Sequence, residues 1–66
     1  MQFGTNLKKY RKLRKLSQTG LSKKTGIPQT TLSDLETGKT SPNLKHLKIL
    51  CESLEISVIE LLDKIL

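Results

Sequence analysis

The sequence predicts an all-α domain of five short helices, and three observations support this prediction. Apolar residues recur at spacings of three and four, the period of a helix that buries one face. Strand patterns are nearly absent, since there is no sustained alternation and aromatic residues make up only 3% of the chain. Capping residues and glycines divide the chain at short intervals. The 66 residues leave room for a single domain over 1–66.

The first predicted helix covers residues 5–15. Leu7, Tyr10 and Leu13, with Phe3 just before the segment, follow one another at helical spacings. The other face carries four basic side chains, those of Lys8, Lys9, Lys12 and Lys15. This pattern is typical of a surface helix with one buried stripe.

The second predicted helix covers residues 17–25. Ser17 is a good N-cap, and Leu21 is the main apolar residue of the segment. Gly26 allows a left-handed C-cap, and Pro28 suits the first turn of another helix. These signals predict a tight turn between two short helices.

The third predicted helix runs over about 28–37, where Leu32 and Leu35 lie three residues apart and Gly38 ends the segment. A fourth follows over about 44–54, with Asn43 as its cap. Its apolar stripe consists of Leu44, Leu47, Leu50, Cys51 and Leu54.

The last predicted helix starts at Ser57 and runs towards Lys64, because Ser57 and Glu60 form a capping box. Its apolar residues exceed what one helical face needs. We expect Val58, Leu61 and Leu62 to close the core. The remaining apolar residues predict a dimer interface of Ile49, Ile59, Ile65 and Leu66. The alternative is that the last two residues simply fray.

Charge is distributed unevenly along this basic chain, whose net charge is +6 and whose pI is about 9.8. Residues 1–33 hold eight lysines and arginines and no acid, whereas residues 34–66 hold four basic and six acidic residues. Such asymmetry indicates a basic face that binds a polyanion, either a nucleic acid or an anionic membrane surface.

No constellation in the sequence indicates catalysis or metal binding. His46 and Cys51 lie five residues apart, which does not place them on one face of a helix, so we expect Cys51 in the core and His46 at the surface. There is no glycine-rich phosphate loop and no Ser-His-Asp set. We therefore expect no enzyme, metal, cofactor or small-molecule ligand. A single cysteine and the lack of a long apolar run favour a reducing cytoplasm.

The middle of the chain has the form of a DNA-binding helix-turn-helix, since two short helices flank a glycine-containing turn. Isolated helices this short are marginal, so they depend on their neighbours for stability. Their side chains are mostly uncharged and polar, and amides and hydroxyls suit the base edges of a major groove. Cations elsewhere in the chain would neutralise phosphates.

The chain resembles the phage repressor and Cro type of helix-turn-helix regulators over about residues 5–62. The residues that carry the resemblance are Leu7-Lys8-Lys9-Tyr10-Arg11, Leu16-Ser17-Gln18, Leu21-Ser22, Thr25-Gly26-Ile27, Leu32-Ser33, Leu35-Glu36-Thr37-Gly38-Lys39, Pro42-Asn43-Leu44 and Leu54-Glu55-Ile56-Ser57. The resemblance implies the compact five-helix fold of lambda repressor, with the second and third helices forming the motif. It also implies sequence-specific binding of double-stranded DNA as a homodimer.

The resemblance further implies roles for individual residues. The positions that face bases are Gln29, Thr30, Ser33 and Asp34. The positions near the sugar-phosphate backbone are Gln18, Thr37, Lys39 and Asn43. Gln18 matches a residue that also braces Gln29, and Arg11 with Glu36 matches a structural ion pair.

The chain departs from the family pattern at several positions. Gly20 replaces a glutamate that would complete a capping box with Ser17, which weakens the second helix by about 1 kcal/mol. Lys15 and Glu55 replace glycines at helix ends, so those turns need a strained backbone or a different cap. Asp34 replaces a basic or amide side chain and either accepts a hydrogen bond from cytosine or repels phosphates.

The sequence thus predicts a transcriptional regulator, and specifically a repressor that binds a palindromic operator as a homodimer, with half-sites about 34 Å apart. The main alternative is an antitoxin or protein-interaction module with the same fold. A basic amphipathic binder of membrane surfaces is a third hypothesis, which the lack of tryptophan disfavours.

Overall fold

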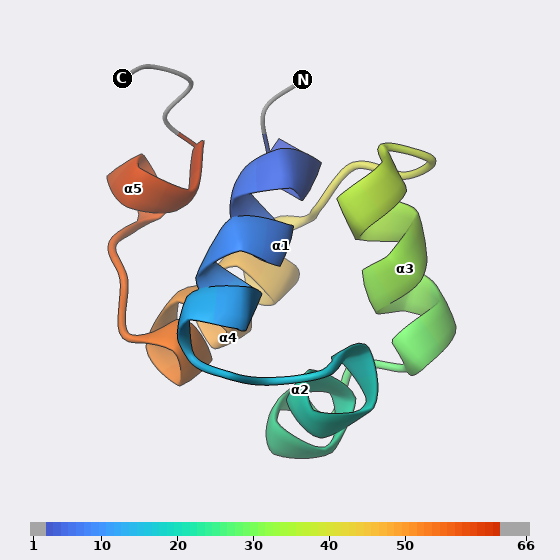
Figure 1. The fold of residues 1–66 in the computed structure, drawn as a ribbon. Helices are drawn as coiled ribbons and strands as arrows, with labels where there is room; N and C mark the ends of the chain where they lie inside the picture. Colours follow the sequence, from blue (N-terminus) through green and yellow to red (C-terminus); the bar gives the residue numbers. More distant parts are fainter. Residues whose placement is uncertain (1–2, 63–66) are drawn as a thin grey trace.

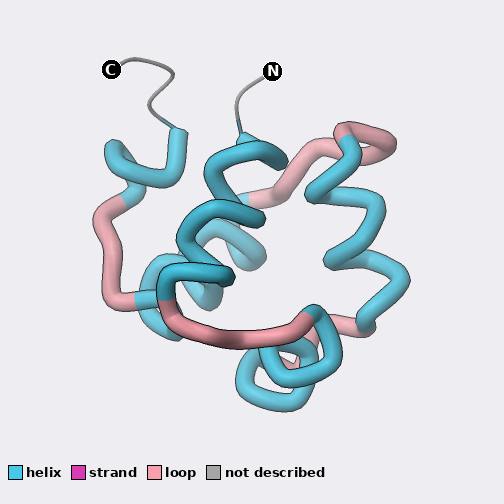
Figure 2. Tube along the Cα trace, in the orientation of Figure 1, coloured by secondary structure: helices cyan, strands magenta, loops and turns pink. Residues whose placement is uncertain are grey.

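The computed structural model describes residues 3–62 and contains five helices in this part of the chain. They are α1 (Phe3–Leu13), α2 (Gln18–Thr25), α3 (Gln29–Thr37), α4 (Leu44–Leu54) and α5 (Val58–Leu62). No strand is present among these residues, and short loops join the helices (Figure 2). The predicted all-α fold of five helices is confirmed. The predicted extension of the last helix towards Lys64 lies outside the described residues.

Helix α1 lies in the middle of the domain, between α3 on one side and α5 on the other (Figure 1). Helix α2 contacts α3 and α4, and α4 contacts α5. In the view of Figure 1, α2 is seen nearly end-on while α3 stands upright, so the two helices cross steeply. This crossing leaves one side of α3 uncovered.

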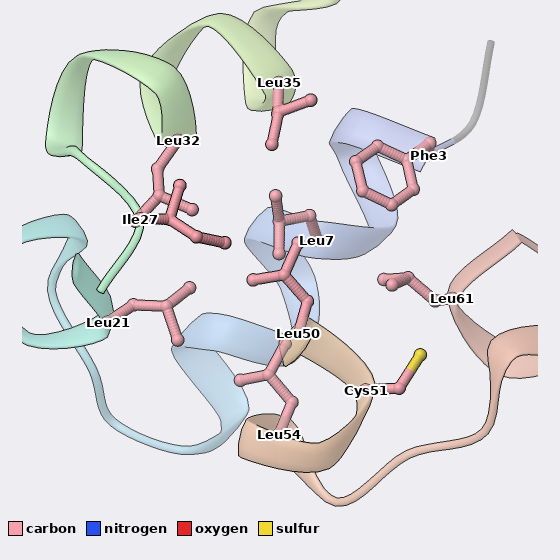
Figure 3. Close-up of a cluster of buried hydrophobic side chains, with 10 residues drawn as sticks. All are labelled: Phe3, Leu7, Leu21, Ile27, Leu32, Leu35, Leu50, Cys51, Leu54 and Leu61. Carbon is pink, nitrogen blue, oxygen red and sulfur yellow. The ribbon is translucent and has the colours of Figure 1, made fainter. Parts of the chain in front are cut away.

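Ten buried side chains form the core, and every helix contributes to it. Figure 3 shows Leu7 of α1 near the centre, with Leu35 of α3 and Leu50 of α4 directed towards it. The other members are Phe3, Leu21, Ile27, Leu32, Cys51, Leu54 and Leu61. Cys51 is a core residue, as predicted.

The predicted capping residues occupy their expected places. The Ser17 hydroxyl accepts from the Gly20 backbone N–H at 2.9 Å, and Asn43 Oδ1 accepts from the His46 N–H at 2.7 Å. At α5 both halves of the capping box form, since the Ser57 N–H donates to Glu60 and the Glu60 N–H donates to Ser57. The local sequence therefore sets where these helices begin.

Helix α1 is shifted by two residues from its predicted range, since it begins at Phe3 and ends at Leu13. Lys15 has a φ of 59°, and Glu55, just after α4, has a φ of 58°. Both residues therefore adopt the left-handed conformation that glycine usually supplies at helix ends. The expectation of strained turns at these positions is confirmed.

Four residues expected on apolar stripes are exposed, and their expected burial was wrong. Leu13 and Leu44 each lie six residues from a buried leucine, which places them about 120° away around the helix. Val58 and Leu62 are exposed because α5 has only five residues, of which Leu61 alone reaches the core.

Candidate nucleic-acid interface

Helix α3 presents a polar face to solvent. Leu32 and Leu35 are buried and anchor the opposite side of the helix. The four predicted base-contacting residues come together on the uncovered side, where Gln29 and Thr30 are exposed and Ser33 and Asp34 are partly exposed. Uncharged donors and acceptors on an exposed helix match the size and chemistry of a DNA major groove.

The turn between α2 and α3 is held by its own hydrogen bonds. The Ser22 hydroxyl donates to the carbonyl of Ile27 at 2.6 Å, and the Ile27 N–H donates to the Thr25 hydroxyl at 3.1 Å. Gly26 has a φ of 79°, and its N–H donates to the carbonyl of Ser22. The buried side chain of Ile27 then ties this turn to the core, which fixes the angle between the two helices.

A buried ion pair holds α3 against α1. Arg11 Nε donates to Glu36 Oε2 at 2.6 Å and Nη2 donates to Glu36 Oε1 at 3.1 Å, with only 9% and 3% of the two side chains exposed. The hydrogen bond to Glu36 raises the pKa of Arg11 above its ordinary value, against the opposing effect of burial. Arg11 Nη1 also donates to the carbonyl of Leu16, so the pair connects α1, α3 and the loop before α2. The predicted structural pair is confirmed.

Gln18 does not brace Gln29 as expected, because its amide donates to Glu36 Oε1 at 3.1 Å instead. The partner of Gln29 is Thr19, whose hydroxyl donates to Gln29 Oε1 at 3.3 Å. Sequence reasoning counted Thr19 among the polar side chains of the motif but gave it no role towards Gln29, although it lies in the same first turn of α2 as Gln18. About a quarter turn separates the two side chains around α2, so they reach opposite ends of α3, Gln18 at Glu36 and Thr19 at Gln29.

Gly4 is a residue that sequence reasoning missed. A Cβ atom at this position would lie 2.5 Å from the carbonyl oxygen of Leu35 and still closer to that of Glu36. Glycine therefore lets the first turn of α1 touch the last turn of α3. The signal in the sequence was the position of Gly4 between Phe3 and Leu7, two apolar residues at helical spacing. A glycine in such a pattern usually allows close packing.

The residues predicted near the DNA backbone lie around α3 with different partners. The Thr37 hydroxyl donates to the carbonyls of Ser33 and Asp34, and the side chain of Asn43 caps α4. Lys39 is exposed just beyond Gly38, at the end of α3. Gln18 is partly exposed at the start of α2, where backbone N–H groups and the helix dipole favour an anion.

The predicted dimer residues differ in their exposure. Ile59 on α5 is 78% exposed, whereas Ile49 is partly buried and packs against the core. Ile65 and Leu66 lie outside the described residues. Val58 and Leu62 were assigned to the core but join Ile59 as exposed apolar residues of α5.

His46 and Cys51, the two residues weighed as a possible metal or nucleophilic site, have different surroundings on α4. Within residues 3–62, no group of three histidine, cysteine or acidic residues could hold a metal ion. His46 is half-buried rather than fully exposed, and its Nδ1 has no hydrogen-bond partner among those residues. None of the described helices is both long enough and apolar enough to cross a membrane.

Comparison with known proteins gives one family match. A family model described as helix-turn-helix matches residues 7–61, which include all five helices in whole or in part. No curated protein and no solved structure matches the chain. The family match covers most of the chain and agrees with the crossing of α2 and α3 and with the polar face of α3. The chain therefore belongs to the helix-turn-helix family of DNA-binding regulators, of the phage repressor and Cro type.

Proposed function

We propose that this protein is a cytoplasmic transcriptional repressor that binds a palindromic operator as a homodimer. The observation that carries the proposal is the polar, uncovered side of α3 on a chain whose N-terminal half is strongly basic. Occupancy of an operator that overlaps a promoter would exclude the polymerase. Because the family binds DNA and is typically non-enzymatic, the action would depend on binding alone.

Base recognition is assigned to α3, placed in the major groove. Gln29 offers an amide donor and acceptor, which match adenine N6 and N7. Thr30 and Ser33 can contact a base edge or a thymine methyl group. Asp34 has no ion-pair partner among the described residues, so its carboxylate is free to accept from cytosine N4.

The DNA backbone is assigned to residues around the ends of α2 and α3. Gln18 and the start of α2 would hold one phosphate, and Lys39 would neutralise another. The side chains of Thr37 and Asn43 already form hydrogen bonds within the protein. Near the DNA backbone they would therefore act mainly by holding the adjacent main chain in place.

The homodimer is assigned to the apolar residues of the C-terminal region, namely Ile49, Ile59, Ile65 and Leu66. Ile59 supports this assignment best, because it is 78% exposed and shares its short helix with two other exposed apolar residues, Val58 and Leu62. Two copies related by a two-fold axis would place their α3 helices in successive major grooves, about 34 Å apart.

The roles can be separated by two substitutions after the operator has been selected from random duplexes at a stated salt concentration. Gln29→Ala should remove about 1–3 kcal/mol of preference at one base pair of each half-site. Lys39→Ala should weaken binding to all sequences alike and reduce the slope of affinity against salt by about 1 for each copy of the protein.

Lys48→Ala is the matched control, because it removes one exposed lysine from α4, a helix that is not among the main contacts of α3. Equal effects of the Lys39 and Lys48 substitutions would mean that only overall charge matters. Unchanged sequence preference in the Gln29 variant would contradict the role given to α3.

A second candidate is a protein-interaction module such as an antitoxin. Three exposed apolar residues on α5, Val58, Ile59 and Leu62, favour it, because a partner protein could cover them instead of a second copy. Sedimentation of the purified protein, which gives its oligomeric state, and selection from random duplexes together separate the two functions. A monomer that selects no DNA sequence would support the protein-interaction module.

A further inference from the structure

Helix α1 makes polar or close contacts on two of its sides. Towards α3 it carries the buried Arg11–Glu36 pair and the close approach at Gly4. Towards α5, the Asn6 side chain donates to the carbonyl of Leu61 at 2.8 Å. Since α1 lies between α3 and α5 (Figure 1), it is the element through which the positions of these two helices are related.

Arg14, just beyond the end of α1, adds a second contact on the side of α5. Its Nε donates to the carbonyl of Leu54 at 2.7 Å, and its Nη2 donates to the carbonyl of Glu55 at 3.3 Å. Carbonyls at the end of a helix lack helical partners, and the helix dipole favours a cation there. The segment 54–61, which contains most of α5, is therefore held at one end by Arg14 and at the other by Asn6.

Helix α5 depends on these contacts because little else fixes its orientation. It has five residues, and Leu61 is the one that is buried. A short helix with a single buried side chain can turn or shift about that side chain at small cost. The exposed residues of α5 are Val58, Ile59 and Leu62, so the contacts made by α1 also orient the surface assigned to the homodimer.

We propose that Asn6 and Arg14 are positioning residues that set the distance and angle between the two α3 helices of the dimer, and with them the length of operator spacer that the protein accepts. The proposal rests on the proposed function, since it uses a homodimer formed through α5. Both side chains bind backbone carbonyls at the far side of α1 from α3. They would therefore affect the spacing of half-sites without reading any base.

A change in spacer length is a large change in geometry. Each base pair added between the half-sites moves one of them by about 3.4 Å and turns it by about 35° around the DNA axis. A dimer that binds both half-sites of a mis-spaced operator must then move α5 relative to α1. This movement breaks the hydrogen bonds made by Asn6 and Arg14, so their loss sets the size of the spacer preference.

The expected effects follow from the size of these hydrogen bonds. Asn6→Ala should reduce the preference for the best spacer over one that is a base pair longer by about fivefold, the contribution of one neutral hydrogen bond. Arg14→Gln should reduce it by about tenfold, because a charged donor is lost. The order of preference for bases within a half-site should stay unchanged, since α3 is still held by Arg11 and Gly4.

The test measures competition between duplexes that carry the same two half-sites with different spacers. Arg14→Lys, which keeps the charge and a donor, should keep most of the spacer preference. Lys12→Gln is the matched control for Arg14→Gln, because it removes the same charge from an exposed lysine of α1. It should weaken binding to all spacers alike and leave their ratio unchanged.

A second measurement needs no DNA. The N–H of Leu61 donates to the carbonyl of Ser57 at 3.1 Å within α5. Its hydrogen exchange should be faster in Asn6→Ala and Arg14→Gln than in the wild type or Lys12→Gln, because α5 is held less firmly. Equal exchange in all four proteins would overturn the proposal.

Unchanged spacer preference in Asn6→Ala and Arg14→Gln, in variants that still dimerise, would also overturn it. The same would follow if Lys12→Gln altered the preference as much as Arg14→Gln. Sedimentation and operator selection with the wild type separate these results from a failure of the proposed function. A monomer that selects no operator would reject that function and this proposal with it, whereas a dimer with an unaltered spacer preference in its variants would reject this proposal alone.

Discussion

The Arg11–Glu36 pair affects both the stability of the fold and the position of α3. It is buried, it is bidentate, and it also receives Gln18 from the start of α2. Such a pair adds little net stability over an apolar replacement, but removal of one partner leaves a buried charge unmatched. The geometry of α3 relative to α1 and α2 therefore depends on both side chains being present.

Glu36→Ala should lower the free energy of unfolding by about 3 kcal/mol, since the Arg11 guanidinium loses the partner that compensates its burial. Glu36→Gln should lose less, about 1–2 kcal/mol, because its amide oxygen still accepts hydrogen bonds. Urea denaturation followed by circular dichroism measures both. Glu52→Ala is the control, an exposed acid on α4 whose removal should change stability by less than about 0.5 kcal/mol. Equal losses at positions 36 and 52 would contradict the importance of the buried pair.

Cys51 is the second residue with a shifted pKa. Burial raises the pKa of its thiol, and the carboxylates of Glu52 and Glu60 raise it further. The folded state thus holds the proton more tightly than the unfolded state does. The contribution of Cys51 to stability is fully present below the unfolded pKa and is lost as the pH rises through the folded pKa.

Iodoacetamide at about pH 8 should therefore modify Cys51 at least tenfold more slowly in the native protein than in concentrated urea, because only the thiolate reacts. Mass spectrometry of timed samples measures the rate. A native protein that reacts as fast as the unfolded one would show that Cys51 is accessible and not part of the core.

At the scale of residues, the sequence predicted the ion pair between Arg11 and Glu36. It did not predict contacts that depend on how the helices are rotated and how closely they pack. Arg11 and Glu36 are opposite charges at positions that match a known family, so their pairing was foreseeable. The contact of Thr19 with Gln29 depends on how far α2 is rotated about its own axis. The place of Gly4 depends on how closely α1 approaches α3. Neither quantity can be read from spacing in the sequence.

At the scale of the helices, the backbone after most helix ends follows one pattern. Four helix ends are followed by residues with positive φ: Lys15, Gly26, Gly38 and Glu55. Two are glycines, which adopt this conformation without strain, and two are not. Left-handed backbone at a residue with a side chain costs about 1 kcal/mol. A glycine at the end of α1 or α4 would therefore make the protein more stable.

Glu55→Gly should raise the free energy of unfolding by about 1 kcal/mol through relief of this strain at the end of α4. Thermal and urea denaturation measure the gain. Glu55→Ala removes the same charge but keeps the Cβ atom, so it should give no gain. Gly38→Ala is the converse change and should lose about 1 kcal/mol, because nothing lies within 4 Å of the added Cβ and only its φ of 84° opposes it. A gain in Glu55→Ala equal to that in Glu55→Gly would assign the effect to charge instead.

The starts of three of the five helices, α2, α4 and α5, were predictable because capping is local. Ser17, Asn43 and Ser57 each act on backbone within three residues, so no tertiary information is needed. The buried face was harder to predict. Leu13 and Leu44 fit a helical spacing with their neighbours, but only the position of the packing partners decides which part of a wide stripe is covered.

At the scale of the whole molecule, a small core lies beside a short helix, α5, whose outer apolar side chains are exposed. Ten side chains form the core, and only Leu61 enters it from α5. The N-terminus of α5 is held by its capping box, and the carbonyl of Leu61 accepts from the Asn6 side chain at 2.8 Å. Helix α5 is thus fixed in place while Val58, Ile59 and Leu62 remain outside. A fixed apolar surface of this kind suits association with a second copy.

Ile59→Lys should therefore weaken the proposed homodimer at least a hundredfold. Burial of one isoleucine contributes about 1.5–3 kcal/mol, and a two-fold axis buries it once in each copy, so both contributions are lost together. Sedimentation equilibrium over a range of concentrations measures the dissociation constant. Operator affinity should fall in parallel, because two half-sites are bound with high affinity only when the two copies are joined.

Leu44→Lys is the matched control for Ile59→Lys, since it introduces the same charge at a leucine that is even more exposed, at 83%, but lies at the start of α4. It should leave the dissociation constant unchanged. If both variants dimerise like the wild type, the interface lies elsewhere, and the exposed face of α5 is left for a different protein partner. If Leu44→Lys alone disrupts the dimer, the two-fold axis passes near the start of α4. The spacing of the two α3 helices, and with it the spacing of the operator half-sites, would then have to be derived from that axis.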